Sequence, residues 1–133
     1  MNLQSLKSRA VALAAVLLVT GTATATDAPA AQSKWRVDFN GKAASDGEML
    51  FRLTPHEGEA ILVTAKIPQG RAQIYIAQDV RDTFKAQLPK ERFRAEIVAL
   101  ERVIVKAHSG EQAFLLELVQ SSVAGTHIHV TPG

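Results

Sequence analysis

The 133-residue sequence contains no cysteine. Disulfide bonds, which brace many small secreted domains, are therefore excluded, and the hydrophobic core alone has to hold the fold. Long apolar runs are missing too. The uncharged stretch 10–26 is 17 residues long, and its second half consists of Thr, Gly and Ala. A membrane-spanning helix needs about 20 predominantly apolar residues. We therefore expect this segment to be cut off as part of an N-terminal leader, and not to anchor the chain in a membrane.

The N-terminus has the three parts of a secretory signal peptide, in order. Lys7 and Arg9 form a positive leader, residues 10–19 are apolar, and Ala23 and Ala25 are the small residues that a signal peptidase requires. No cysteine follows to accept a lipid. We therefore expect an exported protein, periplasmic or secreted, with no membrane anchor after cleavage.

Cleavage divides the chain into three expected parts. Residues 1–25 are the signal peptide, 26–33 a flexible tail, and 34–131 a single small domain. A cut after Ala30 or Ala31 is the alternative.

Removal of the leader also leaves no excess of either charge. Of the 15 Lys and Arg, two lie in the leader, whereas all 13 Asp and Glu follow residue 25. The processed chain is therefore formally neutral, with 13 residues of each sign. Such a chain lacks the excess of positive charge found in proteins that bind nucleic acid or anionic membranes. We therefore expect no nucleic-acid binding.

Three strands are expected before residue 70. Apolar and polar residues alternate over 35–40, 48–54 and 60–67. Residues 55–58, Pro-His-Glu-Gly, form a turn between the second and third strands, which we expect to pair as an antiparallel hairpin.

The period then changes to that of a helix. Ile76, Val80 and Phe84 are spaced by four, which predicts an amphipathic helix over about 72–88. Pro89 ends it, because proline cannot continue the hydrogen-bond ladder.

The segment after the helix leaves two possibilities open. Residues 93–98 and 102–107 both resemble strands, but the connection Ala99-Leu100-Glu101 has no Gly, Asn or Pro. Residues 93–107 are therefore either a hairpin or one long bent strand.

Two later segments complete the expected fold. Phe114, Leu116 and Leu118 share one face of a strand, and Ile128 and Val130 share one face of the last strand. The order is three strands, one helix and three further strands. This predicts an α+β fold, a mostly antiparallel sheet with one amphipathic helix packed on one face.

The pattern resembles the small β-β-α-β-β insertion modules of flagellins, hook-associated proteins and phage tail proteins. The resemblance covers roughly residues 47–130 and rests on these segments: Gly47–Pro55, Ile67–Gly70, Ala77–Phe84, 93–98 and 102–106. The chain departs from the module late in the helix, where Lys85-Ala86 stand in place of an Ile-Asn pair. The resemblance implies a structural or surface-exposed role for such a module and no catalytic residues.

Two histidines near the C-terminus are candidate metal ligands. His127 and His129 lie two apart on the last strand, so both project from one face. A site needs at least three protein ligands, and the other histidines, His56 and His108, lie in separate turns. A solvated strand face is the simpler interpretation, and copper or zinc is the ion expected if metal binds.

No grouping in the sequence favours catalysis. Asp79 and Asp82 have cations nearby, and the serine pair at 121–122 lies in a bend without a Gly-x-Ser-x-Gly elbow. No phosphate-binding loop or dinucleotide fingerprint occurs, so no cofactor and no enzymatic activity are expected.

The start of the helix is a possible interface. Ile74, Tyr75 and Ile76 follow one another and cannot all face the same core, so some of them are expected at the surface. Sheet edges are the other docking surfaces that we expect.

Two functions follow as hypotheses. The first is an exported, non-catalytic module that acts by protein binding or assembly with an exported or envelope protein of a bacterium. The alternative is a periplasmic metal-binding protein that uses His127 and His129.

Processing is the first testable prediction. N-terminal sequencing of the exported protein should begin at Thr26, or at the latest by Gln32, because the signal peptidase cuts after the small residues. An exported fraction that retains Met1 would contradict export by cleavage.

Overall fold

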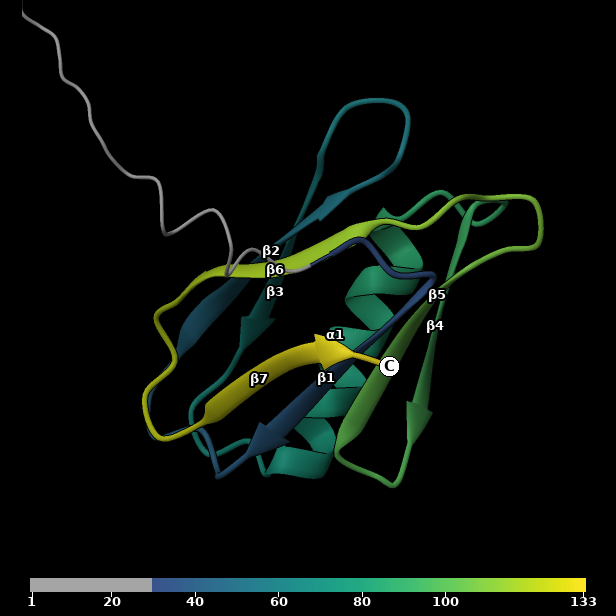
Figure 1. Cartoon of the computed structure of the whole chain (residues 1–133). Coiled ribbons are helices and arrows are strands. Elements are labelled where there is room, and N and C mark those ends of the chain that lie inside the picture. Colours follow the sequence, from purple (N-terminus) through teal and green to yellow (C-terminus); the bar gives the residue numbers. More distant parts are fainter. Residues whose placement is uncertain (1–29) are drawn as a thin grey trace, which may run out of the picture. The chain divides into compact units, whose positions relative to one another are not determined.

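The computed structural model describes residues 30–133, which contain seven strands and one helix (Figure 1). The strands are β1 (Lys34–Asn40), β2 (Gly47–Thr54), β3 (Ile61–Ile67), β4 (Phe93–Val98), β5 (Arg102–Ala107), β6 (Leu115–Ser121) and β7 (His127–Pro132). The helix α1 (Gln73–Gln87) follows β3 in the sequence. All strand pairings are antiparallel, so the predicted α+β class is confirmed. The predicted signal peptide lies outside the described residues.

The strands form two sheets. One has the order β4-β5-β1-β7 and the other the order β3-β2-β6. The helix contacts β3 and β4, which are edge strands of different sheets, and it also packs on β1 and β5. The edge strands β6 and β7 also contact each other. The two sheets and the helix therefore enclose one core.

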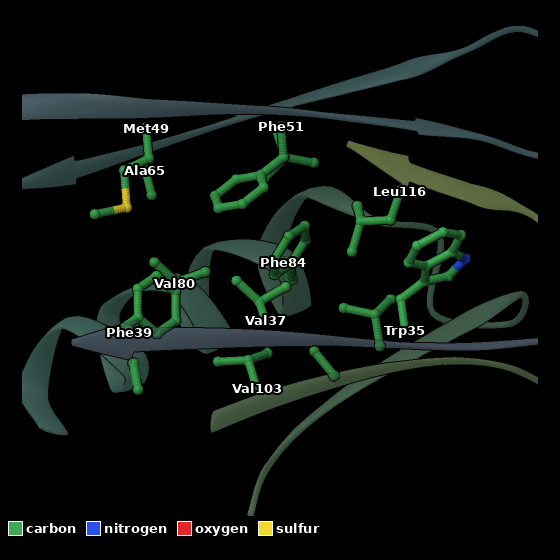
Figure 2. Close-up of a cluster of buried hydrophobic side chains, with 14 of the residues drawn as sticks. Trp35, Val37, Phe39, Met49, Phe51, Ala65, Val80, Phe84, Val103 and Leu116 are labelled. Atoms are coloured by element: carbon green, nitrogen blue, oxygen red, sulfur yellow. The ribbon is translucent and has the colours of Figure 1, made fainter. Parts of the chain in front are cut away.

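Alternation along the strands supplies that core from both sheets (Figure 2). Trp35, Val37 and Phe39 point inward from β1, and Met49 and Phe51 face them from β2. The ring of Phe51 lies 5.1 Å from the ring of Phe84 on the helix. No polar or charged residue is buried within residues 30–133, so burial of apolar surface is the main source of stability.

The helix has the predicted position and core face. It begins after Ala72, which provides no side-chain cap, and it ends before Pro89. Ile76, Ala77, Val80 and Phe84 are its buried residues. The spacing of four therefore identified the core side correctly.

The paired backbone begins before the expected domain boundary at residue 34. Gln32 exchanges two backbone hydrogen bonds with Phe114, at 2.9 and 2.8 Å. Ala107 N–H donates to Ser33 O at 2.9 Å. Gln32 and Ser33, which the sequence assigned to a flexible tail, are thus part of the fold.

The segment 93–107 is a hairpin, so four strands follow the helix instead of three. β4 and β5 pair up to Val98 and Arg102, and the connection contains Ala99 with φ 57° and Leu100 with φ 67°. The loop is three residues long, Ala99 to Glu101, and hairpin loops of this length need positive φ in the turn, which Gly or Asn adopts most easily. Of the two alternatives left open by the sequence, the hairpin is the one found. The sequence could not decide between them because Ala and Leu adopt this conformation at a cost of about 1–2 kcal/mol per residue.

The helical face gives the second testable prediction. Phe84→Ala should lower the free energy of unfolding by about 3–5 kcal/mol, because it removes a fully buried ring. Lys85→Ala, at the next and exposed position, is the matched control and should change it by less than about 0.5 kcal/mol. Denaturant unfolding of both variants measures the difference, and equal small effects would contradict the packing described here.

The hairpin gives the third testable prediction. The double substitution Ala99→Asn and Leu100→Gly should raise the free energy of unfolding by about 1 kcal/mol, because it relieves two left-handed residues. Ala60→Gly, in an exposed loop without positive φ, should leave it unchanged or lower it. Urea denaturation compares the two. A less stable Asn-Gly hairpin would show that the turn stores no strain.

Candidate functional site

The outer face of the four-stranded sheet carries an excess of positive charge. Because Trp35 and Val37 point into the core, the alternate residues of β1 point outward, and the strand registers place outward residues of β4, β5 and β7 beside them. Five cations lie there and define what we call the cationic face: Lys34, Arg36, Arg94, Arg102 and Lys106. Two carboxylates, Asp38 and Glu96, share this surface, which leaves a net charge of three positive.

Each of the two carboxylates is held between two cations. Asp38 accepts a hydrogen bond from Arg102 Nε at 2.6 Å, and its other oxygen lies 3.2 Å from Arg36 Nε. Glu96 lies 3.3 Å from Arg94 and 3.4 Å from Lys106. These links hold the guanidinium groups in defined positions, so the face is preorganised.

The pKa of Glu96 reflects the cations that surround its carboxyl group. Burial by itself would raise the pKa of its carboxyl group, but the hydrogen bonds and positive charges of Arg94 and Lys106 outweigh this and hold the pKa below its ordinary value. Glu96 therefore stays ionised at neutral pH, and the cations around it outnumber the carboxylates.

An apolar residue lies within the cationic face. Ile104 points outward on β5, opposite Arg36 and Glu96, yet only 8% of it is exposed. Long charged side chains cover apolar surface with their aliphatic stems while their charged groups stay in water. The neighbouring stems therefore shield Ile104, and the charged groups remain at the surface.

The β4–β5 hairpin adds an apolar tip to this face. Val98 is 44% exposed and lies opposite Arg102, and Leu100 is 67% exposed in the strained turn. Exposed apolar side chains beside arginines are typical of protein interfaces. We call Val98 and Leu100 the hairpin tip.

The two C-terminal histidines also lie on the outer side of this sheet. The register places His129 opposite Asp38 and His127 opposite Asn40, and both imidazoles are exposed. Asp38 is already bound by two arginines. Within residues 30–133, no three His, Cys, Asp or Glu side chains are close enough to hold a metal ion. Metal binding by His127 and His129 stays a prediction.

The expected interface at the start of the helix is wrong for Ile76. That residue is fully buried, because it belongs to the same helical face as Val80 and Phe84. Ile74 is half-buried and Tyr75 is 45% exposed. The sequence expectation that part of this trio is exposed is thus met by Tyr75.

Tyr75 belongs to a polar cluster. The guanidinium of Arg71 lies 5.2 Å from the centre of the Tyr75 ring. Arg71 also donates two hydrogen bonds to Asp79, at 2.8 and 2.9 Å. The start of the helix therefore presents a stacked Arg–Tyr pair, and no continuous apolar patch.

The other candidate groups have structural partners. Asp82 pairs with Arg81 at 2.7 Å. Ser121 accepts a hydrogen bond from the backbone of Val123, and Ser122 accepts one from the backbone N–H of Glu48. These contacts account for the residues without assigning them chemistry.

Sequence reasoning missed the cationic face, although a signal for it exists. Trp35 and Val37 of β1 point into the core, so Lys34 and Arg36, which alternate with them, point outward. The net charge of the chain after residue 25 is zero, because the acidic residues that balance these cations lie on other surfaces. The net charge therefore does not indicate the local excess of cations.

Comparisons with known proteins found no match to any family model, any curated protein or any solved structure. The resemblance to flagellin and phage tail modules therefore stays a prediction. In residues 30–133, α1 is the single helix, and it is too short and polar to cross a bilayer.

Proposed function

We propose that this chain is an exported, non-catalytic module that binds an acidic surface of another exported or envelope protein through its cationic face. The observation that carries the proposal is the net positive charge of that face. It occurs in a chain with equal numbers of cationic and acidic residues after residue 25. Segregation of charge onto one face of a sheet favours an oppositely charged partner surface.

The composition of the face favours a protein as the partner. Arginine is enriched at protein interfaces and forms paired hydrogen bonds with carboxylates, and three of the five cations are arginines. The cationic face thus offers donors to acidic side chains.

The hairpin tip gives the same surface an apolar margin. Leu100 and Val98 are exposed next to Arg102. Burial of an apolar side chain on binding contributes about 25 cal/mol per Å², and such burial supplements charge pairing that water and salt would otherwise weaken. Contacts of both kinds make a short-range, specific interface.

Charge reversal is the fourth testable prediction. Lys34 and Lys106 are directly opposite each other, so Lys34→Glu with Lys106→Glu replaces one like-charge pair by another and changes the net charge of the face from three positive to one negative. The processed variant should stay folded and should bind its partner at least about tenfold more weakly, because complementary charges become like charges. Affinity capture from the cell envelope and medium identifies the partner, and titration with the purified partner gives the affinity.

A matched control makes the same change of net charge elsewhere. Lys42→Glu with Lys66→Glu reverses two exposed lysines off the cationic face and should leave the affinity near that of the unsubstituted chain. Binding should also weaken as salt is added. Equal affinity of the two double variants, or a partner without an acidic surface, would contradict the proposal.

A further inference from the structure

A small pocket lies between the end of the helix and the first residues of β4. Its volume is about 210 Å³. These residues line it: Phe84, Lys85, Leu88, Lys90, Phe93, Arg94, Ala95 and His108. The pocket is thus formed by the helix, the segment after Pro89 and the edge of the four-stranded sheet.

The floor of the pocket is apolar and firmly packed. Phe84, Leu88, Phe93 and Ala95 are all buried. The Phe93 ring lies 5.1 Å from the ring of Phe114, edge to face, and the Phe84 ring lies 5.1 Å from the ring of Phe51, tilted at 52°. Rings fixed on their far side cannot collapse into the space, so the hollow exists before anything binds.

The charged side chains that line the pocket are all cations. They are Lys85, Lys90 and Arg94; His108 also lines the pocket, and no carboxylate does. Arg94 pairs with Glu96 at 3.3 Å. Within residues 30–133, neither Lys85 nor Lys90 forms an ion pair.

The helix gives a structural reason for a positive charge at position 85, but not for the one at position 90. Lys85 lies in the last turn of the helix, where a cation interacts favourably with the helix dipole. Lys90 lies beyond Pro89, outside the helix, and has no such role. A gap in packing would place no requirement on the charge around it, whereas a site for an anion would.

We propose that this pocket binds a small amphipathic anion, an apolar ring or chain of about six carbons that carries a carboxylate. An apolar cavity of about 150 Å³ accommodates benzene, so about 210 Å³ accommodates such a group. The apolar part lies against Leu88, Phe93 and Ala95, which keep a small exposed fraction, and the carboxylate meets Lys85 and Lys90. The site shares Arg94 with the cationic face, but the two lysines that meet the carboxylate do not belong to that face, so each site is tested with its own variants.

Three ligands of one chain length test the proposal. Hexanoate, hexanamide and hexylammonium share an alkyl chain and differ in the charge of the head group. We expect the processed protein to bind hexanoate about tenfold more tightly than hexanamide, and hexylammonium most weakly, because a charged hydrogen bond is stronger than a neutral one. Titrations followed by amide chemical shifts give the affinities and locate the binding residues.

Two sets of variants identify the source of the preference. Lys85→Gln with Lys90→Gln should reduce the preference for hexanoate over hexanamide to about onefold, whereas Lys42→Gln with Lys66→Gln, at exposed positions that do not line the pocket, should preserve it. Ala95→Leu should fill the pocket and abolish binding of all three ligands, with the amide spectrum reporting that the variant is folded.

Two outcomes would overturn the proposal. Equal binding of hexanoate and hexanamide to the unsubstituted protein would show that the pocket is an apolar packing gap. Shifts at Lys34, Arg36 and Arg102 in place of the pocket residues would show that hexanoate is only a counterion of the cationic face. Neither result would affect the Lys34 and Lys106 test of protein binding, so the two proposals can fail separately.

Discussion

The alternation of side chains along β1 is the constraint on which the rest of this structure depends. β1 is paired on both sides, with β5 and β7, so each of its residues is fixed on one face of the sheet. Trp35, Val37 and Phe39 enter the core, and this requires Lys34, Arg36 and Asp38 to point outward. A slip of one residue would bury the charges and expose the aromatic rings. The hydrophobic core and the cationic face are thus two results of one register.

Trp35 connects this strand to the other sheet. Its indole Nε1 donates a hydrogen bond of 2.7 Å to the carbonyl oxygen of Phe114, the residue just before β6. A buried indole needs such a partner, because an unpaired polar group in the core would cost free energy. Phe114 in turn packs on Phe93, which lines the pocket. The contacts that hold the core together therefore also shape the pocket at its margin.

Strain and charge are placed together at one end of the four-stranded sheet. Ala99 and Leu100, which have left-handed backbone conformations, lie at the end of the hairpin. They are close in sequence to Arg102, which forms an ion pair with Asp38. Backbone strain in an exposed turn persists when the surrounding structure holds it in place, and it is frequent where a protein contacts a ligand. Here the strained turn presents an apolar side chain beside a cationic surface, a combination that suits a docking surface.

The sequence by itself determined most of the secondary structure, because that depends on short-range periodicity; the β4–β5 hairpin is the exception. The alternation over 35–40 and 60–67 and the spacing of Ile76, Val80 and Phe84 identified elements that the structure has at nearly the same bounds. Only the tertiary structure decided how the strands divide into two sheets, since β1 pairs with strands more than sixty residues away in the chain. It also decided the sign of each surface. The cations of the outer sheet face come from three strands, and the pocket comes from a helix, a loop and an edge strand. The cations of β1 and those of β4 and β5 lie more than fifty residues apart in sequence and meet only through strand pairing. The pocket residues lie mostly within 84–95, but the packing of the helix end beside β4 was not evident from the sequence.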